Sequence, residues 1–167
     1  MDTVAKLLTM PIPQLQAYHH YADQREWLGI PYAANVLSNL PLLAVGIAGL
    51  SQNNRTPSRT LMNVGVIAAA LGSTYYHLAP DDRRLAWDRL GMSVALAGAL
   101  GSAAEESTSR SAARASGTAI ATLVANAAAK GCELLDRPIW NVTGELISGH
   151  TLKHLLFAVG FGLRELR

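Results

Sequence analysis

Two long stretches without a formal charge follow each other in the first half of the chain, and they restrict its fold more than any other feature. Residues 32–50 and 61–79 each contain 19 residues with no Asp, Glu, Lys or Arg. A helix needs about 20 mostly apolar residues to cross the hydrocarbon core of a bilayer. The polar residues 51–60 separate the two stretches, as in a helical hairpin. The pattern predicts membrane helices, and a soluble helical bundle with a very apolar core is the rival interpretation.

Three further apolar segments extend this pattern, at 85–104, 118–135 and 144–163, and the Ser- and Arg-rich segment 105–117 is expected to be a loop. Only 16% of the residues are charged, against roughly 25% in ordinary soluble domains. We therefore expect an all-α fold, a multi-pass transmembrane helical bundle of about five spans, built as a single membrane domain over residues 1–167.

Charge and cysteine content exclude several classes of function. The net charge of +2 is small, and no basic cluster lies beside aromatic residues, so a nucleic-acid partner is not expected. The single cysteine, Cys132, allows neither an internal disulfide framework nor a cysteine-based zinc finger. The sequence does not identify protein partners.

Polar residues inside the apolar segments are the candidates for function, because ionisable side chains at membrane depth are costly. Ser73 and His77 are four residues apart, and so are His150 and His154, so each pair lies on one face of a helix. Two imidazoles at this spacing can bind one metal ion. A structural role, in which each histidine bonds one helix to another, is the alternative.

Successive spans cross the membrane in alternating directions, which predicts that these residues meet. The end of the second span, the start of the third and the start of the fifth all face the same side of the membrane. His77, Asp88, His150 and His154 are therefore expected at one depth, with Ser73 one turn deeper. Three neutral imidazoles leave the fourth position of a zinc ion open for water, which is typical of a catalytic site.

Asp88 and Ser73 have possible chemical roles beside such an ion. Asp88 can take a proton from water and return it to a leaving amine, or it can simply pair with Arg84 or Arg89. Ser73 can donate a hydrogen bond to a developing oxyanion, or it can bond the backbone four residues earlier.

Four motifs give the chain a resemblance to the alkaline ceramidases, a family within the wider superfamily of seven-span zinc hydrolases and adiponectin-type receptors. They are residues 35–41 (NVLSNLP), 72–77 (GSTYYH), 87–90 (WDRL) and 150–154 (HTLKH). The spacing of Ser73, His77, Asp88, His150 and His154 is similar to that of the family. The resemblance covers most of residues 21–104 and 129–163.

The resemblance implies a zinc-dependent hydrolase that cleaves the amide bond of a ceramide-like N-acyl lipid in the bilayer. It implies zinc on His77, His150 and His154, with Asp88 and Ser73 as catalytic partners. Residues 133–140 are similar to bacterial members, so Glu133 and Asp136 become candidates for supporting the zinc ligands. A Lys130–Glu133 ion pair that only packs helices is the alternative. The expected location is the bacterial inner membrane, as an integral multi-pass protein.

The chain also departs from the family pattern. Two of the seven spans are expected to be missing between Ala104 and Thr118. Because a pair of spans is lost, the remaining spans still alternate in direction across the membrane. Gly91 also stands where the family usually has a proline. Asp23 and Glu26 resemble two acids that bind calcium in some eukaryotic relatives, but residues 31–34 supply no carboxylate, which argues against calcium. His19 and His20 lie outside the pattern and are expected at the surface or at the membrane interface.

Two other functions compete with the hydrolase. One is a non-enzymatic membrane receptor or sensor, since the superfamily resembles receptors that keep the same zinc. The other is an inactive, shortened relative in which a structural zinc only joins helices.

Overall fold

A computed structural model describes residues 13–53, 55–107 and 112–165, with the backbone alone over 112–119. The described chain is helical and contains no strand, only an isolated β-bridge between Trp27 and Ile30. The all-α prediction is therefore confirmed. The elements are η1 (Gln16–His19), α2 (Ala33–Leu37), α3 (Leu40–Leu50), α4 (Pro57–Leu78), α5 (Asp82–Ser107), α6 (Ala112–Leu134), α7 (Asp136–Val142) and α8 (Gly149–Glu165).

Local chemistry explains where the main helices begin and end. Thr56 caps α4 by accepting a hydrogen bond from the backbone N–H of Arg59 at 3.3 Å, and Pro57 occupies the first turn. Helix α4 ends before Pro80, which cannot continue a helix. The Asp81 carboxylate then accepts the backbone N–H of Arg84 at 2.7 Å and so supports the start of α5.

Two predicted boundaries were wrong. The segment 105–117 is not one long loop, because α5 continues to Ser107 and α6 already begins at Ala112, with residues 108–111 outside the described part. The first apolar stretch is not one regular helix either, because it breaks between α2 and α3 at Ser38 and Asn39. The short helix α7 precedes the segment predicted at 144–163, and α8 begins within that segment at Gly149.

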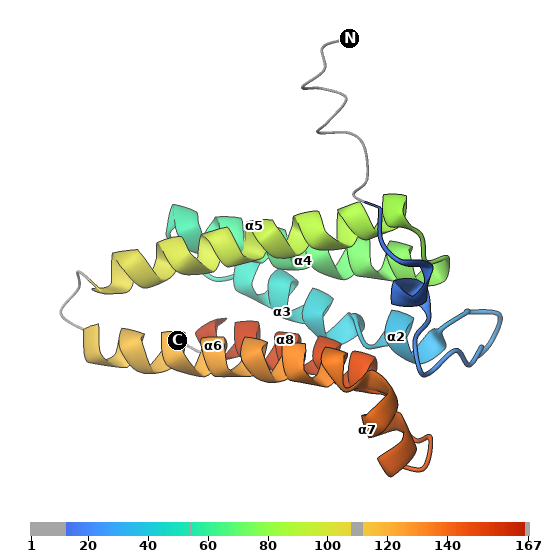
Figure 1. Ribbon diagram of the computed structural model, residues 1–167. Coiled ribbons are helices and arrows are strands. Elements are labelled where there is room, and N and C mark those ends of the chain that lie inside the picture. The colour runs from blue at the N-terminus through green and yellow to red at the C-terminus, as the bar shows by residue number, and fades with distance from the viewer. Residues whose placement is uncertain (1–12, 54, 108–111, 166–167) are drawn as a thin grey trace, which may run out of the picture.

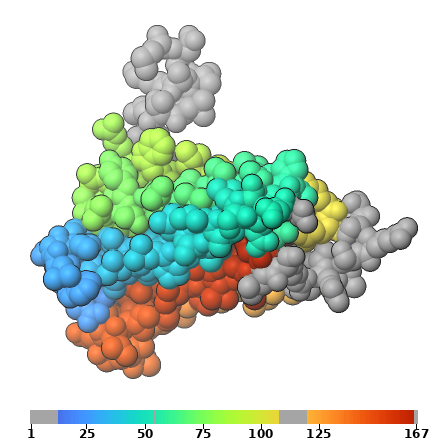
Figure 2. Space-filling model, turned by 180° about the vertical axis from the view of Figure 1, so that it is seen from behind, coloured from blue at the N-terminus to red at the C-terminus, as the bar shows by residue number. Residues whose placement is uncertain are grey.

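The helices pack into two pairs joined by α3. Helices α4 and α5 form an antiparallel hairpin along their whole length, and α6 packs along α8 (Figure 1). Figure 2 shows α3 between α4 and α8 on one face of the molecule. An apolar cluster where α3, α4, α5 and α8 meet includes Leu42, Met62, Val66, Ala95 and Phe161.

The α4–α5 hairpin is held by very close helix contact. A Cβ at Gly65 would collide with the backbone of Ala95, and a Cβ at Gly91 would collide with the backbone of Ala69. Glycine at both positions lets the two helical backbones touch.

One stretch of the described chain, residues 33–50, is long and apolar enough to cross a membrane, and 44% of it is buried inside the molecule. The predicted count of about five spans is not supported by this test of length and composition. Helices α4 and α5 carry polar side chains within their apolar runs, such as Asn63 and His77 in α4 and Asp88 in α5, and α8 is short at 17 residues.

Candidate metal centre

Three histidines from two helices meet in the interior. His77 lies near the end of α4, while His150 and His154 lie one turn apart at the start of α8. Their exposed fractions are 0%, 4% and 3%. Their ligand nitrogen atoms all lie within 4.8 Å of one another, and they form the one group of three or more potential metal-binding side chains in the described part of the chain. The expected meeting of these residues is therefore found, and the cluster could hold a metal ion.

The cluster geometry suits a transition-metal ion. The Nε2 atoms of His77 and His150 face each other at 3.2 Å. Two imidazole nitrogens bound to a tetrahedral zinc at about 2.0–2.1 Å lie about 3.3 Å apart. His77 Nδ1 is buried and has no hydrogen-bond partner among the described residues. The widest separation, up to 4.8 Å, means that an ion bound by all three would draw the rings closer.

Ser38 fixes the orientation of the third imidazole. Its hydroxyl donates to the backbone carbonyl of Asn35 at 3.0 Å and lies 2.8 Å from His154 Nδ1. Because a serine hydroxyl carries one proton, it must accept from His154 Nδ1–H. The proton on Nδ1 leaves Nε2 of His154 as the free acceptor beside the other two rings. The NVLSNLP motif contains this serine, but its role was not predicted from the sequence.

Tyr21 covers the histidines from the N-terminal segment. Its ring centroid lies 4.8 Å from that of His77 and 4.3 Å from that of His150, and the residue is buried. Burial raises the pKa of the Tyr21 hydroxyl well above its ordinary value, so this phenol stays neutral. Nothing in the local sequence signals this contact, since residues 20–32 have no helical periodicity.

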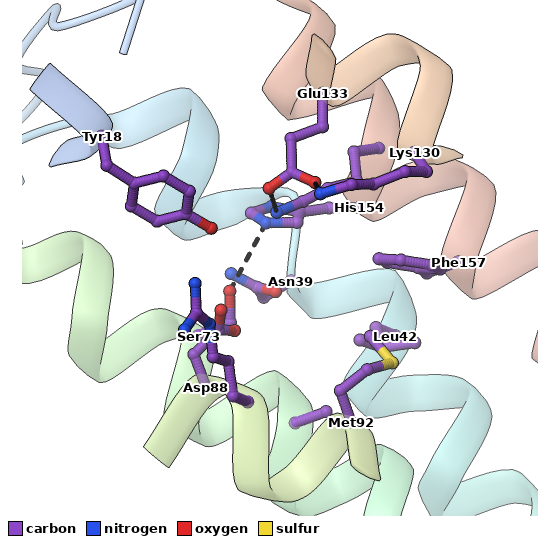
Figure 3. Close-up of a pocket in the computed structure, with 13 residues that line it drawn as sticks. Tyr18, Asn39, Leu42, Ser73, Asp88, Met92, Lys130, Glu133, His154 and Phe157 are labelled. Carbon is purple, nitrogen blue, oxygen red and sulfur yellow. Dashed lines mark hydrogen bonds and ion pairs between the residues drawn. The ribbon is translucent and has the colours of Figure 1, made fainter. Parts of the chain in front are cut away.

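Ser73 and Asp88 line a cavity of about 250 Å³ together with one member of the cluster, His154. Ser73 Oγ lies 3.4 Å from His154 Nε2, so its hydroxyl faces the histidines. Figure 3 shows the Asp88 and Ser73 side chains together on one wall of this cavity. Of the two alternative partners of Asp88, Arg84 pairs with Asp81, whereas Arg89 lies over the ring of Tyr18 and lines the same cavity as Asp88.

Glu133 and Asp136 have different positions relative to the cluster. Glu133 forms ion pairs with Lys130 and Lys153 and lines the cavity. Asp136 accepts the backbone N–H of His150 at 2.7 Å and that of Ala22 at 2.8 Å. Asp136 thus joins the start of α8 to the segment that carries Tyr21, and it supports the position of His150 through the backbone.

The remaining predicted residues lie outside the cluster. The Asp23 carboxylate pairs with Arg25 at 2.7 Å, while Glu26 is exposed, and no third acid joins these two in the described chain. His20 is exposed, as expected, but the surface position predicted for His19 was wrong. His19 is buried because its ring bonds the Tyr76 hydroxyl at 2.8 Å and Asp82 at 3.1 Å.

Comparison of this chain with protein-family models, with curated proteins and with solved structures gives no match.

Proposed function

We propose that this chain is a zinc-dependent multi-pass membrane hydrolase that cleaves the amide bond of a ceramide-like N-acyl lipid. The observation that carries the proposal is the meeting of three buried imidazoles with Ser73 and Asp88 beside one cavity. Three neutral nitrogen ligands are the set found in catalytic zinc sites with an open position. The ordered resemblance of the four sequence motifs to the alkaline ceramidases supports the same reaction.

The outer surface supports a position within the membrane. Large apolar side chains are exposed on all the long helices, including Ile47 on α3, Leu71 on α4, Leu100 on α5, Leu123 on α6 and Val159 on α8. Exposed apolar area of this extent is unusual for a soluble monomer. The interior holds polar side chains beside its apolar cluster, and helix contacts through glycine are typical of membrane bundles. Five spans formed by α2–α3, α4, α5, α6 and α8 fit these features.

The cavity suits the apolar part of a lipid. Beyond Ser73 and Asp88, its wall is formed one turn deeper by Leu42, Met92 and Phe157 (Figure 3). Residues of α3, α4, α5, α6 and α8 line it. The substrate's acyl chain would extend along the apolar part of this wall.

Each residue around the imidazoles has its own role in amide hydrolysis. When bound, zinc supplies a Lewis acid that polarises a carbonyl and activates water. Asp88 takes a proton from the attacking water and delivers it to the leaving amine. The Ser73 hydroxyl donates a hydrogen bond to the substrate carbonyl oxygen as its negative charge develops. The neutral Tyr21 ring and the tightly packed helices keep bulk water from the imidazoles.

The test combines metal content with turnover. The full chain purified in detergent is expected to contain one zinc ion per molecule and to release fatty acid from a panel of N-acyl lipids. His154→Ala is expected to lose the zinc. Asp88→Asn is expected to keep the zinc but lose at least about 100-fold in kcat, in line with the loss of a general acid–base. Asp81→Asn, at an exposed carboxylate seven residues earlier, is the matched control and should keep full activity.

The competing functions predict other results. A chain that holds zinc but hydrolyses no N-acyl lipid would favour the receptor or the inactive relative. A purified chain without any metal, or a turnover that survives complete chelation, would overturn the zinc hydrolase.

A further inference from the structure

Lys153 is a buried cation beside the candidate reaction site. It precedes His154 on α8, its side chain is only 10% exposed, and it lines the same cavity as Ser73 and Asp88. A buried ammonium is costly unless its charge and its three N–H donors find partners. The partners of Lys153 therefore decide what this cavity binds.

The protein compensates this charge only in part. The described partner of Lys153 is Glu133, at 3.5 Å between Nζ and Oε1. The other oxygen of the same carboxylate is held closely by Lys130, so one carboxylate serves two ammonium groups. The remaining charged side chains in the cavity wall are Asp88 and Arg89. Three cations thus face two carboxylates, and a bound zinc ion would add further positive charge.

The excess charge lies at one end of the cavity. Figure 3 shows Glu133 and Lys130 at the opposite end from Met92, with the Tyr18 ring near them. Tyr18, Lys130 and Glu133 also line a neighbouring cavity of about 440 Å³, to which Arg137 contributes a further cation and Asp136 a further carboxylate. A substrate whose acyl chain lies along the apolar wall would place its amine portion among these basic side chains.

We propose, on the basis of the hydrolase function above, that the preferred substrates are N-acyl lipids whose amine portion carries an anionic group such as a carboxylate. Lys153 Nζ binds that anion and thereby sets specificity, while Glu133 keeps Lys153 in place. In the reaction, the amide C–N bond breaks and a C–O bond to the water oxygen forms. One water proton moves to the leaving nitrogen, so the products are a fatty acid and an anionic amine compound such as an amino acid.

Two amides of nearly equal size provide the test. N-Palmitoylglycine and N-palmitoylethanolamine differ chiefly in a carboxylate against a hydroxyl. We expect the zinc-loaded wild-type chain in detergent to show a kcat/KM at least about tenfold higher for the glycine conjugate, the scale of one charge-assisted hydrogen bond. Lys153→Met should abolish this preference, and Lys153→Arg should restore most of it. Arg83→Met, an exposed residue at the start of α5, is the control and should keep the preference.

The outcomes separate specificity from function. Equal or faster turnover of the ethanolamide by the wild type would overturn the anion specificity while leaving the hydrolase standing. An unchanged preference in Lys153→Met that still holds its zinc would also overturn it. If the wild type hydrolyses neither amide nor any other N-acyl lipid, the hydrolase function itself fails. The wild-type comparison decides the matter even if Lys153→Met does not fold.

Discussion

Single side chains outside the histidine cluster fix the tautomer and the orientation of its imidazole rings. Ser38 is the clearest case, because its one proton is used on the Asn35 carbonyl and the hydroxyl must therefore accept from His154 Nδ1–H. The free Nε2 of His154 then faces His77 and His150. A polar partner of this kind fixes both the tautomer and the ring orientation of a metal ligand.

Ser38→Ala should weaken zinc binding by about 10–100-fold, the usual effect of losing a group that orients a histidine ligand. The measurement is the zinc dissociation constant of the purified chain in competition with a chelator of known affinity. Ser93→Ala is the matched control, because the exposed Ser93 hydroxyl only bonds the Arg89 carbonyl of its own helix. Unchanged zinc affinity in Ser38→Ala would show that this hydrogen bond does not position the ring.

The sequence predicted some of these residues and not others for physical reasons. The i, i+4 spacing of His150 and His154 and the alternation of successive helices were enough to bring them to His77, because helix geometry is regular. Tyr21 and His19 could not be placed, since they lie in an irregular segment whose path depends on tertiary bonds such as Asp136 to Ala22. Ser38 was visible in a motif, but its contact with His154 spans 116 positions of the chain.

At the scale of elements, the α4–α5 contact depends on glycine. The helices touch backbone to backbone at Gly91, where a Cβ would meet Ala68 and Ala69. A bulkier residue at position 91 would therefore not fit against α4. The helix lengths were predicted less well, since the small and polar residues that end α5 and begin α6 are compatible with both loop and helix.

Gly91→Ala is expected to destabilise the chain by about 1–3 kcal/mol, because the added methyl forces the two helices apart. Gly131→Ala is the matched control within α6, where nothing lies within 4 Å of the added carbon. Alanine there should be neutral or stabilising by up to about 1 kcal/mol. Thermal unfolding in detergent measures both, and equal melting temperatures for the two variants would contradict the close contact at Gly91.

At the scale of the whole molecule, many large apolar side chains are exposed, and polar side chains are buried in addition to the apolar cluster. The large apolar side chains are exposed along the long helices, while a polar network is buried at the end away from the histidines. In that network Glu165 accepts from Asn63 at 3.2 Å and pairs with Arg59 at 3.6 Å. A test of mean hydropathy does not detect the exposed apolar surface, because the buried polar side chains lower the mean hydropathy of each helix.

The chain should therefore remain in the membrane pellet when membranes from expressing cells are washed with alkaline carbonate, which releases peripheral proteins. A bilayer is the solvent that best accommodates the exposed apolar side chains. Recovery of folded chain in the wash supernatant would contradict the membrane position, and a known peripheral protein in the same sample serves as the control for the wash.

Zinc should also stabilise the fold as a whole. An ion that binds the folded chain at a free concentration 100 times its dissociation constant adds about 2.7 kcal/mol. The melting temperature should fall on chelation and recover on adding zinc, and His77→Ala should abolish the response. His20→Ala, which removes an exposed histidine, should respond as the wild type does. A wild-type melting temperature that changes neither with chelator nor with added zinc would argue against a metal at this cluster.

The division of the ligands between helices has a mechanical consequence. His77 belongs to the α4–α5 pair, whereas His150 and His154 belong to the α6–α8 pair, and residues of both pairs line the cavity beside them. An ion held by all three histidines would join the two pairs at one end. Under the proposed function, metal binding would then limit how far the two pairs can separate, and with it the access of a lipid to the cavity.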